Sequence, residues 1–184
     1  MGRRSLREER RVELARAFVR VLGTHGRGGA TIAALAAEAG VAPGLVHHFF
    51  ADKSELLGVV VDQLLADFHA RADAMPGDPL DAYADAALGL GERSDVVAAR
   101  AWVGLFADAL AAPELFARVR RALDGEIERA ERRSALAPHE AGAVVAFVVG
   151  ALVLGAFAPR RTAGFAAPSL KRIVAGWRRT RRAP

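Results

Sequence analysis

A helical periodicity runs along the whole chain of 184 residues and constrains the fold more than any other feature. Aliphatic residues recur at spacings of three and four, and stretches in which apolar and polar residues alternate are missing. Hydrophobic residues make up 52% of the sequence, which is enough to build a buried core. We therefore expect an all-α protein.

Glycine and proline divide this helical pattern into segments. The Gly26–Gly29 stretch ends a first helix of about residues 5–25, and Pro159 with Gly164 predicts a loop over residues 158–167. The other expected helices cover about residues 32–38, 43–49, 52–75, 79–90, 94–111, 113–134, 138–157 and 168–181.

The composition narrows the chemistry and the setting. The chain has no cysteine, so disulfides and thiolate metal sites are excluded and a reducing cytoplasm is the natural compartment. Arg3, Arg4 and Arg7 open the chain with no apolar segment behind them, so no signal peptide is expected.

Charge is distributed unevenly along the chain. Residues 1–57 carry a net +3, residues 58–157 a net −6, and residues 158–184 a net +8 with no acidic residue. Basic segments bind polyanions, of which nucleic acid is the common one. For the C-terminal segment the alternative is a solvated tail that only increases solubility.

Residues 143–158 form an uncharged and almost entirely apolar run. A membrane span needs about 20 such residues, so this shorter run argues against one. A helix that is apolar on all sides is otherwise buried in a core or at a subunit interface. We expect no contact with a membrane.

The segment 31–57 contains two short helices joined by a turn. Thr31 is a suitable N-cap for the first, Gly40 supplies the turn, and Pro43 begins the second. Asp52, with Glu55 three residues on, begins the longer helix that follows. This arrangement predicts a helix-turn-helix, whose second helix presents its N-terminal residues to the major groove of DNA.

The same segment resembles the DNA-binding domain of the tetracycline-repressor (TetR) family. The shared positions, in order and spacing, are Thr31, Ile32, Ala36, Ala39, Gly40, Val41, Gly44, His48, Phe50, Lys53, Leu56 and Leu57. The resemblance implies a three-helix DNA-binding domain (residues 1–51) and a larger helical domain (residues 52–184), connected by the helix 52–75. It further implies a homodimer formed through the helices near 138–157 and 168–181, a small-molecule effector, and repression at a near-palindromic operator.

The resemblance also assigns roles to single residues. Thr31 and Lys53 would contact phosphate, and His47 and His48 would face the DNA backbone. The base edges would face Ala42, Pro43, Gly44 and Leu45, while Arg3, Arg4 and Arg7 would form an N-terminal arm that reaches DNA. Three positions depart from the family pattern: alanine at 42 replaces a capping serine, leucine at 45 a polar residue, and histidine at 47 a tyrosine. The reading face therefore has few hydrogen-bonding groups.

A ligand pocket in this family lies in the C-terminal domain. The candidate lining residues here are Phe68, Tyr83, Trp102, Phe106 and Leu110, of which the last three share one helix face. Asp108, Arg100 and His69 could hold a polar group of the ligand. The alternative is that all of these residues belong to an ordinary core.

Two other classes of protein remain to be weighed. An enzyme is disfavoured because no HExxH motif, Cys/His ligand cluster or nucleophile elbow is present, so we expect no catalytic residue, bound metal or cofactor. A helical adaptor of the same fold that has lost specific DNA binding is the second alternative, favoured by the apolar residues 42–45.

Overall fold

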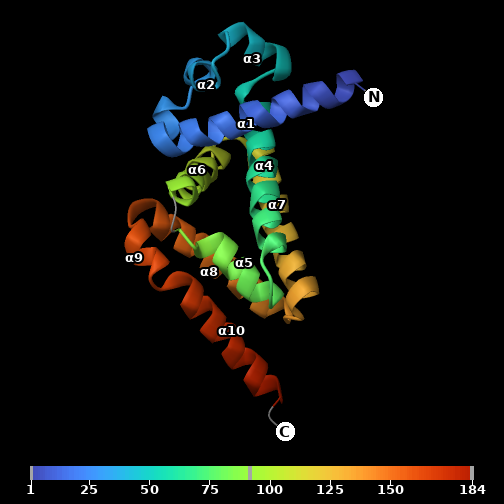
Figure 1. Cartoon of the computed structure of the whole chain (residues 1–184), viewed down its shortest axis with the longest axis vertical. Coiled ribbons are helices and arrows are strands. Elements are labelled where there is room, and N and C mark those ends of the chain that lie inside the picture. Colours follow the sequence, from blue (N-terminus) through green and yellow to red (C-terminus); the bar gives the residue numbers. More distant parts are fainter. Residues whose placement is uncertain (1, 91–92, 183–184) are drawn as a thin grey trace. The chain divides into compact units, whose positions relative to one another are not determined.

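The computed structural model describes the chain over residues 2–90 and 93–182, and the side chains over residues 6–90 and 95–181. Ten helices and no strand occur in these ranges, so the predicted all-α fold is confirmed (Figure 1). The helices are α1 (Gly2–Gly29), α2 (Ile32–Ala39), α3 (Pro43–Phe49), α4 (Lys53–Ala74), α5 (Pro79–Leu88), α6 (Arg93–Ala109), α7 (Pro113–Ser134), α8 (Pro138–Phe157), α9 (Pro159–Ala163) and α10 (Ala166–Arg182).

Contacts divide the chain into two compact units. The first unit consists of residues 1–66 and 97–122, and the second of residues 67–96 and 123–184. The helices α4, α6 and α7 each contribute residues to both units. The boundary predicted from sequence, between residues 51 and 52, separates a DNA-binding part from a regulatory part. These contact-based units do not test it, so it stays a prediction.

In the first unit, α1 packs against α2 and α3. Its apolar stripe is buried as expected: Leu14, Phe18, Val21 and Leu22 are each at most 2% exposed. Gly23 allows α6 to approach closely, because a Cβ atom there would collide with the backbone carbonyl of Val97. The helix is kinked at Gly26, whose φ of 64° is left-handed, one residue after the predicted end.

The second unit is built around α8. Its buried valines Val144 and Val148 pack with Leu88 of α5 and with Leu170 and Val174 of α10. Ion pairs line the same junction, because Lys171 Nζ lies 2.6 Å from Asp85 and Arg178 Nη1 lies 2.8 Å from Asp78. The C-terminal basic segment is thus a packed helix, and a solvated tail is the wrong description of it.

Two sequence-based expectations need correction. Residues 158–167 were expected to form a loop, but Pro159–Ala163 form the short helix α9 and α10 already begins at Ala166. Proline fits the first turn of a helix, and Thr162 is buried with its hydroxyl donating to the carbonyl of Ala158 at 2.9 Å. Tertiary burial therefore stabilises a helix that the local sequence signals argue against.

The second correction concerns α8. The helix has 20 residues and contains an 18-residue stretch with a mean hydropathy of 2.1, so it is long and apolar enough to cross a membrane, although the uncharged run within it is shorter. Length therefore does not argue against a span. Within the second unit, Ala141, Val144, Val148 and Ala151 of this helix are buried in the core, and this burial accounts for much of its apolar character.

Candidate nucleic-acid interface

Local sequence fixes the first half of the helix-turn-helix. Thr31 lies in an extended conformation, and its hydroxyl accepts a hydrogen bond from the N–H of Ala34 at 3.0 Å, so the predicted N-cap is confirmed. Gly40 ends α2 with a φ of 66°, a left-handed conformation that glycine adopts without strain. The N–H of Val41 donates to the carbonyl of Ala36 at 2.9 Å and closes the turn.

The second half of the motif is the exposed helix α3, which is bent by 102° from α2, within the range of helix-turn-helix proteins. Val46 is fully buried and anchors the helix, whereas Ala42, Pro43 and Gly44 are exposed and Leu45 is half-buried. Ala42 makes no side-chain cap, as its departure from the family pattern predicts. The N-terminal end of α3 is therefore open to a partner and lacks side-chain hydrogen-bonding groups.

The residues that follow α3 add basic groups at the same end of the first unit. His47 and His48 are exposed on the last turn of α3. Lys53 begins α4 and is half-buried, and its ammonium has no ion-pair partner in the described part of the chain. A cation in the first turn of a helix is unfavourable next to the helix dipole, so this position suits an external anion better than a structural role.

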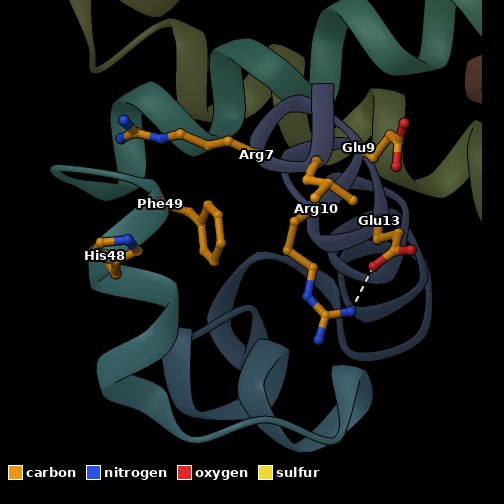
Figure 2. A pocket seen from close by; sticks show the side chains of 7 residues that line it. Arg7, Glu9, Arg10, Glu13, His48 and Phe49 are labelled. Carbon is orange, nitrogen blue, oxygen red and sulfur yellow. Dashed lines mark hydrogen bonds and ion pairs between the residues drawn. The ribbon is translucent and has the colours of Figure 1, made fainter. Parts of the chain in front are cut away.

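An open groove of about 770 Å³ separates the first half of α1 from the end of α3. Figure 2 shows Phe49 pointing into this groove, with His48 beside it and Arg10 reaching in from α1. Arg10 is paired with Glu13 at 2.6 Å, whereas Arg7 lies exposed at the rim. The side chains of Arg3 and Arg4, the other members of the predicted N-terminal arm, lie outside the described residues.

The predicted ligand-binding residues form two aromatic pairs, one in each unit. In the second unit, the rings of Phe68 and Tyr83 meet edge to face with centroids 5.0 Å apart. In the first unit, Trp102 and Phe106 stack with centroids 5.6 Å apart, and both are half-buried. Leu110 lies beyond the end of α6 and is 82% exposed, so it does not share a helical face with this second pair.

The residues that could hold a polar group of a ligand, which are His69, Arg100 and Asp108, also belong to different units. His69 Nε2 lies 2.5 Å from Oε1 of the buried Glu126, and the other oxygen of that carboxylate has no hydrogen-bond partner in the described structure. Burial, together with the neighbouring carboxylate of Glu126, raises the pKa of the Tyr83 phenol. Asp108, in the first unit, pairs with Arg27. Arg100 is exposed on α6.

Two residues that sequence reasoning missed carry contacts in these regions, namely Glu126 and Arg11. The partners of Glu126 lie 57 residues away in sequence, and Arg11 reaches Glu55 across 44 residues. No local pattern could have identified either residue. Among the described residues, no three or more His, Cys, Asp or Glu side chains lie together in a way that could hold a metal ion.

A capped helix, a glycine turn and an exposed second helix are the features of the helix-turn-helix class of DNA-binding proteins. The sequence profile described as "Bacterial regulatory proteins, tetR family" matches residues 14–60. The HTH-type transcriptional regulator BetI of Stenotrophomonas maltophilia (strain R551-3) is 30% identical over 190 residues, covering 96% of this chain and 95% of that protein. The chain therefore belongs to the TetR family of bacterial transcriptional regulators.

Other matches agree with this assignment. BetI of Brucella canis is 41% identical over 58 residues, which cover 32% of this chain and 29% of that protein. A transcriptional regulator from Rhodococcus sp. Rha1 has the same fold, with a TM-score of 0.76 at 22% identity over 86% of this chain and 90% of that one. The multidrug binding protein EbrR, complexed with malachite green, has a TM-score of 0.66 at 26% identity over 89% of this chain and 97% of that one.

Family membership settles two of the expectations drawn from sequence. The resemblance to TetR regulators is confirmed, and so is an all-α fold with the helix-turn-helix near the N-terminus. The protein is a DNA-binding transcriptional regulator and not an enzyme, since its relatives are transcriptional regulators.

Proposed function

We propose that this protein is a ligand-responsive repressor that binds a near-palindromic operator as a homodimer in the bacterial cytoplasm. The observation that carries the proposal is the exposed end of α3, followed by Lys53, whose ammonium has no ion-pair partner among the described residues. A DNA-binding head of residues 1–51 would then be controlled by a regulatory domain of residues 52–184, with α4 as the connection. Repression is the usual behaviour of this family.

The proposed DNA contacts fall into two groups. Backbone phosphates would be bound by Thr31, His47, His48, Lys53 and the arm that contains Arg7, because these groups are exposed or unpaired and carry donors. Base edges would face the residues at the start of α3, which are Ala42, Pro43, Gly44 and Leu45. Contacts with thymine methyl groups suit these side chains better than hydrogen bonds do.

The homodimer would form through α8 and α10, the helices near 138–157 and 168–181. One face of α8 is exposed and uncharged along its length, and it is made of Ala143, Ala146, Gly150, Val153, Leu154 and Phe157. Phe157 is 78% exposed and Leu154 is 55% exposed, which is unusual for apolar side chains on a charge-free face. A second copy of the same chain would cover this face and form a four-helix bundle.

The effector would be an apolar or aromatic small molecule with few polar anchors. The Phe68–Tyr83 and Trp102–Phe106 pairs offer aromatic surfaces, and Glu126 offers a carboxylate oxygen without a partner. The crystallised complex of EbrR with malachite green supports an aromatic ligand. Leu110 is the weakest member of the predicted set because of its exposure. An effector acts only if it binds one arrangement of the two DNA-binding heads better than another.

A helical adaptor without specific DNA recognition is the second candidate. It is favoured by one observation, which is that the exposed residues Ala42, Pro43 and Gly44 offer no side-chain hydrogen bond to a base. Such a protein would bind DNA through charge alone, with equal affinity for every sequence.

Selection of duplexes from a randomised DNA library by the wild-type protein tests the proposal. We expect enrichment of a near-palindromic sequence, two protomers per duplex, and a linear fall of log affinity with log salt concentration. A library that stays random after several rounds, with binding that is salt-sensitive but indifferent to sequence, would favour the adaptor.

A further inference from the structure

One arginine of α1 joins three consecutive parts of the DNA-binding head. The guanidinium of Arg11 donates one hydrogen bond to the carbonyl of Phe49, the last residue of α3. Its other terminal nitrogen donates to Oε1 of Glu55 at 2.7 Å, in the first turn of α4. Its Cζ lies 4.6 Å from the centre of the Phe50 ring, which is 2% exposed. The side chain of Arg11 is itself only 16% exposed.

Glu55 closes the connection from the other side. Its second oxygen accepts a hydrogen bond from the N–H of Ala51 at 2.8 Å, and its own N–H donates to Asp52 at 2.8 Å. The expected capping pair of Asp52 and Glu55 is present, but the carboxylate of Glu55 turns back to residue 51. The hydrogen bonds from Ala51 and Arg11 lower the pKa of Glu55 because they favour its charged carboxylate.

The helix that these contacts hold has little stability of its own. It has seven residues, and its N-cap Ala42 makes no side-chain hydrogen bond. Isolated helices of this length are unstable in water, so tertiary contacts must fix the position of α3. At its C-terminal end the carbonyl of Phe49 points at a cation, which is the favourable sign for the dipole at that end.

We propose that Arg11 is a positioning residue for DNA recognition. Through Phe49, Phe50 and Glu55 it fixes the recognition helix α3 and the start of α4, which carries Lys53, in one relative placement. It contacts no DNA itself. This inference rests on the proposed function, because it takes α3 as the base-reading helix and Lys53 as a phosphate ligand.

The principal alternative is that Arg11 binds a DNA phosphate directly, as a basic residue near the DNA-binding end could. Its burial and its internal partners argue against this, since both terminal nitrogens are engaged and Phe50 lies against its plane. The two roles differ in salt dependence. Losing a phosphate contact lowers the slope of log affinity against log salt by about one, whereas losing a positioning contact leaves the slope unchanged.

The experiment compares Arg11→Met, Glu55→Gln and a matched control, Arg20→Met, in the full chain. Arg20 also lies on α1 and pairs with a helix-turn-helix glutamate, Glu38, at 2.6 Å, and its other hydrogen bond in the described structure is to the carbonyl of Arg16 in α1 itself. Affinity is measured on the duplex that the wild-type protein selects and on a scrambled duplex, at several salt concentrations. Thermal unfolding and far-UV circular dichroism report the folded fraction.

We expect Arg11→Met to lower the affinity for the selected duplex about tenfold. The loss of affinity for the scrambled duplex should be severalfold smaller, and the slope of log affinity against log salt should not change. Glu55→Gln should lower the ratio of the affinity for the selected duplex to that for the scrambled duplex by a smaller factor. The reason is that the glutamine side chain has the size of the glutamate and keeps one acceptor oxygen. The control Arg20→Met should leave both affinities and the ratio as in the wild-type protein.

Two outcomes would overturn the inference alone. Equal losses on both duplexes with a slope lower by about one would make Arg11 a phosphate ligand. An unchanged affinity ratio in both folded variants would leave Arg11 with a structural role only. If Arg11→Met is unfolded at the assay temperature, Glu55→Gln decides between the same outcomes. A wild-type protein that enriches no duplex would overturn the proposed function, and this inference with it.

Discussion

The two basic ends of the chain use their charge differently. In α10, Lys171, Arg178 and Arg181 pair with Asp85, Asp78 and Glu140 of the same compact unit. At the start of α4, Lys53 has no such partner in the described part of the chain. Three cations of the C-terminal helix thus neutralise acidic residues from the middle of the sequence, whereas Lys53 is the cation that we propose to bind an external anion.

This difference teaches that net charge does not locate a nucleic-acid surface. The C-terminal segment is the more basic of the two, with a net +8 against +3 for residues 1–57. Its paired side chains nevertheless stabilise the packing of α10 on α5 and α8. Net charge therefore has to be read together with the partners of the individual cations.

Among the tests of this comparison, we expect the largest effect on the free energy of unfolding. Arg181 Nη1 lies 2.9 Å from Oε2 of Glu140, whose side chain is 7% exposed, and Arg181→Ala would leave that buried carboxylate without a cation. We expect a loss of roughly 1–3 kcal/mol in the free energy of unfolding, measured by urea denaturation. Arg172→Ala, on the same helix and without an ion pair in the described structure, is the control and should change stability little. An equal loss in both variants would contradict a specific role for this pair.

A smaller effect is expected on DNA affinity. Lys53→Ala should weaken binding to every duplex severalfold and lower the salt slope by about one, because one phosphate contact is lost. Arg179 is an exposed arginine of α10 without an ion pair among the described residues, and Arg179→Ala should leave both the affinity and the slope unchanged. If Arg179→Ala lowered the slope and Lys53→Ala did not, the assignment of the two ends would have to be reversed.

The smallest effect concerns acid stability at the junction of α5 and α10. Partial burial raises the pKa of Asp78, but the hydrogen bonds from Arg178, Leu80 and Asp81 outweigh it and leave the pKa below its usual value. A depressed pKa contributes stability above the unfolded-state value, and this contribution is lost as the pH falls through the folded-state value. The pair is partly exposed, so we expect less than about 1 kcal/mol.

Asp78→Asn isolates this charge because asparagine still caps α5. The variant should be slightly less stable than the wild-type protein at neutral pH, and the two unfolding curves should converge below the usual pKa of 3.8 for an aspartate. Thermal unfolding between pH 2 and 7 measures this. A difference that persists unchanged at the lowest pH would assign the effect to geometry and not to charge.

Sequence was sufficient wherever the structure depends on short-range signals. Thr31 as an N-cap, Gly40 as the left-handed turn and Pro43 at a helix start were all predictable, because each acts on the backbone within four residues. The helices at 113–134 and 138–157 were predicted to the residue for the same reason, since a proline marks the start of each.

The sensor residues show where this reasoning stops. Spacing placed Trp102, Phe106 and Leu110 on one face, but α6 ends at Ala109 and Leu110 turns into solvent. The short helix α9 was missed because the burial of Thr162 depends on packing and not on a local sequence signal. Helix ends and burial depend on neighbours that are distant in sequence, and local periodicity carries no record of them.

The sequence by itself determined the all-α class, the helix-turn-helix and the family, because repeated apolar spacing and a short motif with a glycine turn specify them locally. Only the tertiary structure decided that Arg11 binds Phe49 and Glu55, that Glu126 meets His69, and that Arg178 pairs with Asp78. Each of these contacts joins residues from 38 to 100 positions apart. Such pairs form only when the packing of helices brings them together, and helical periodicity fixes the face of a residue but not its partner.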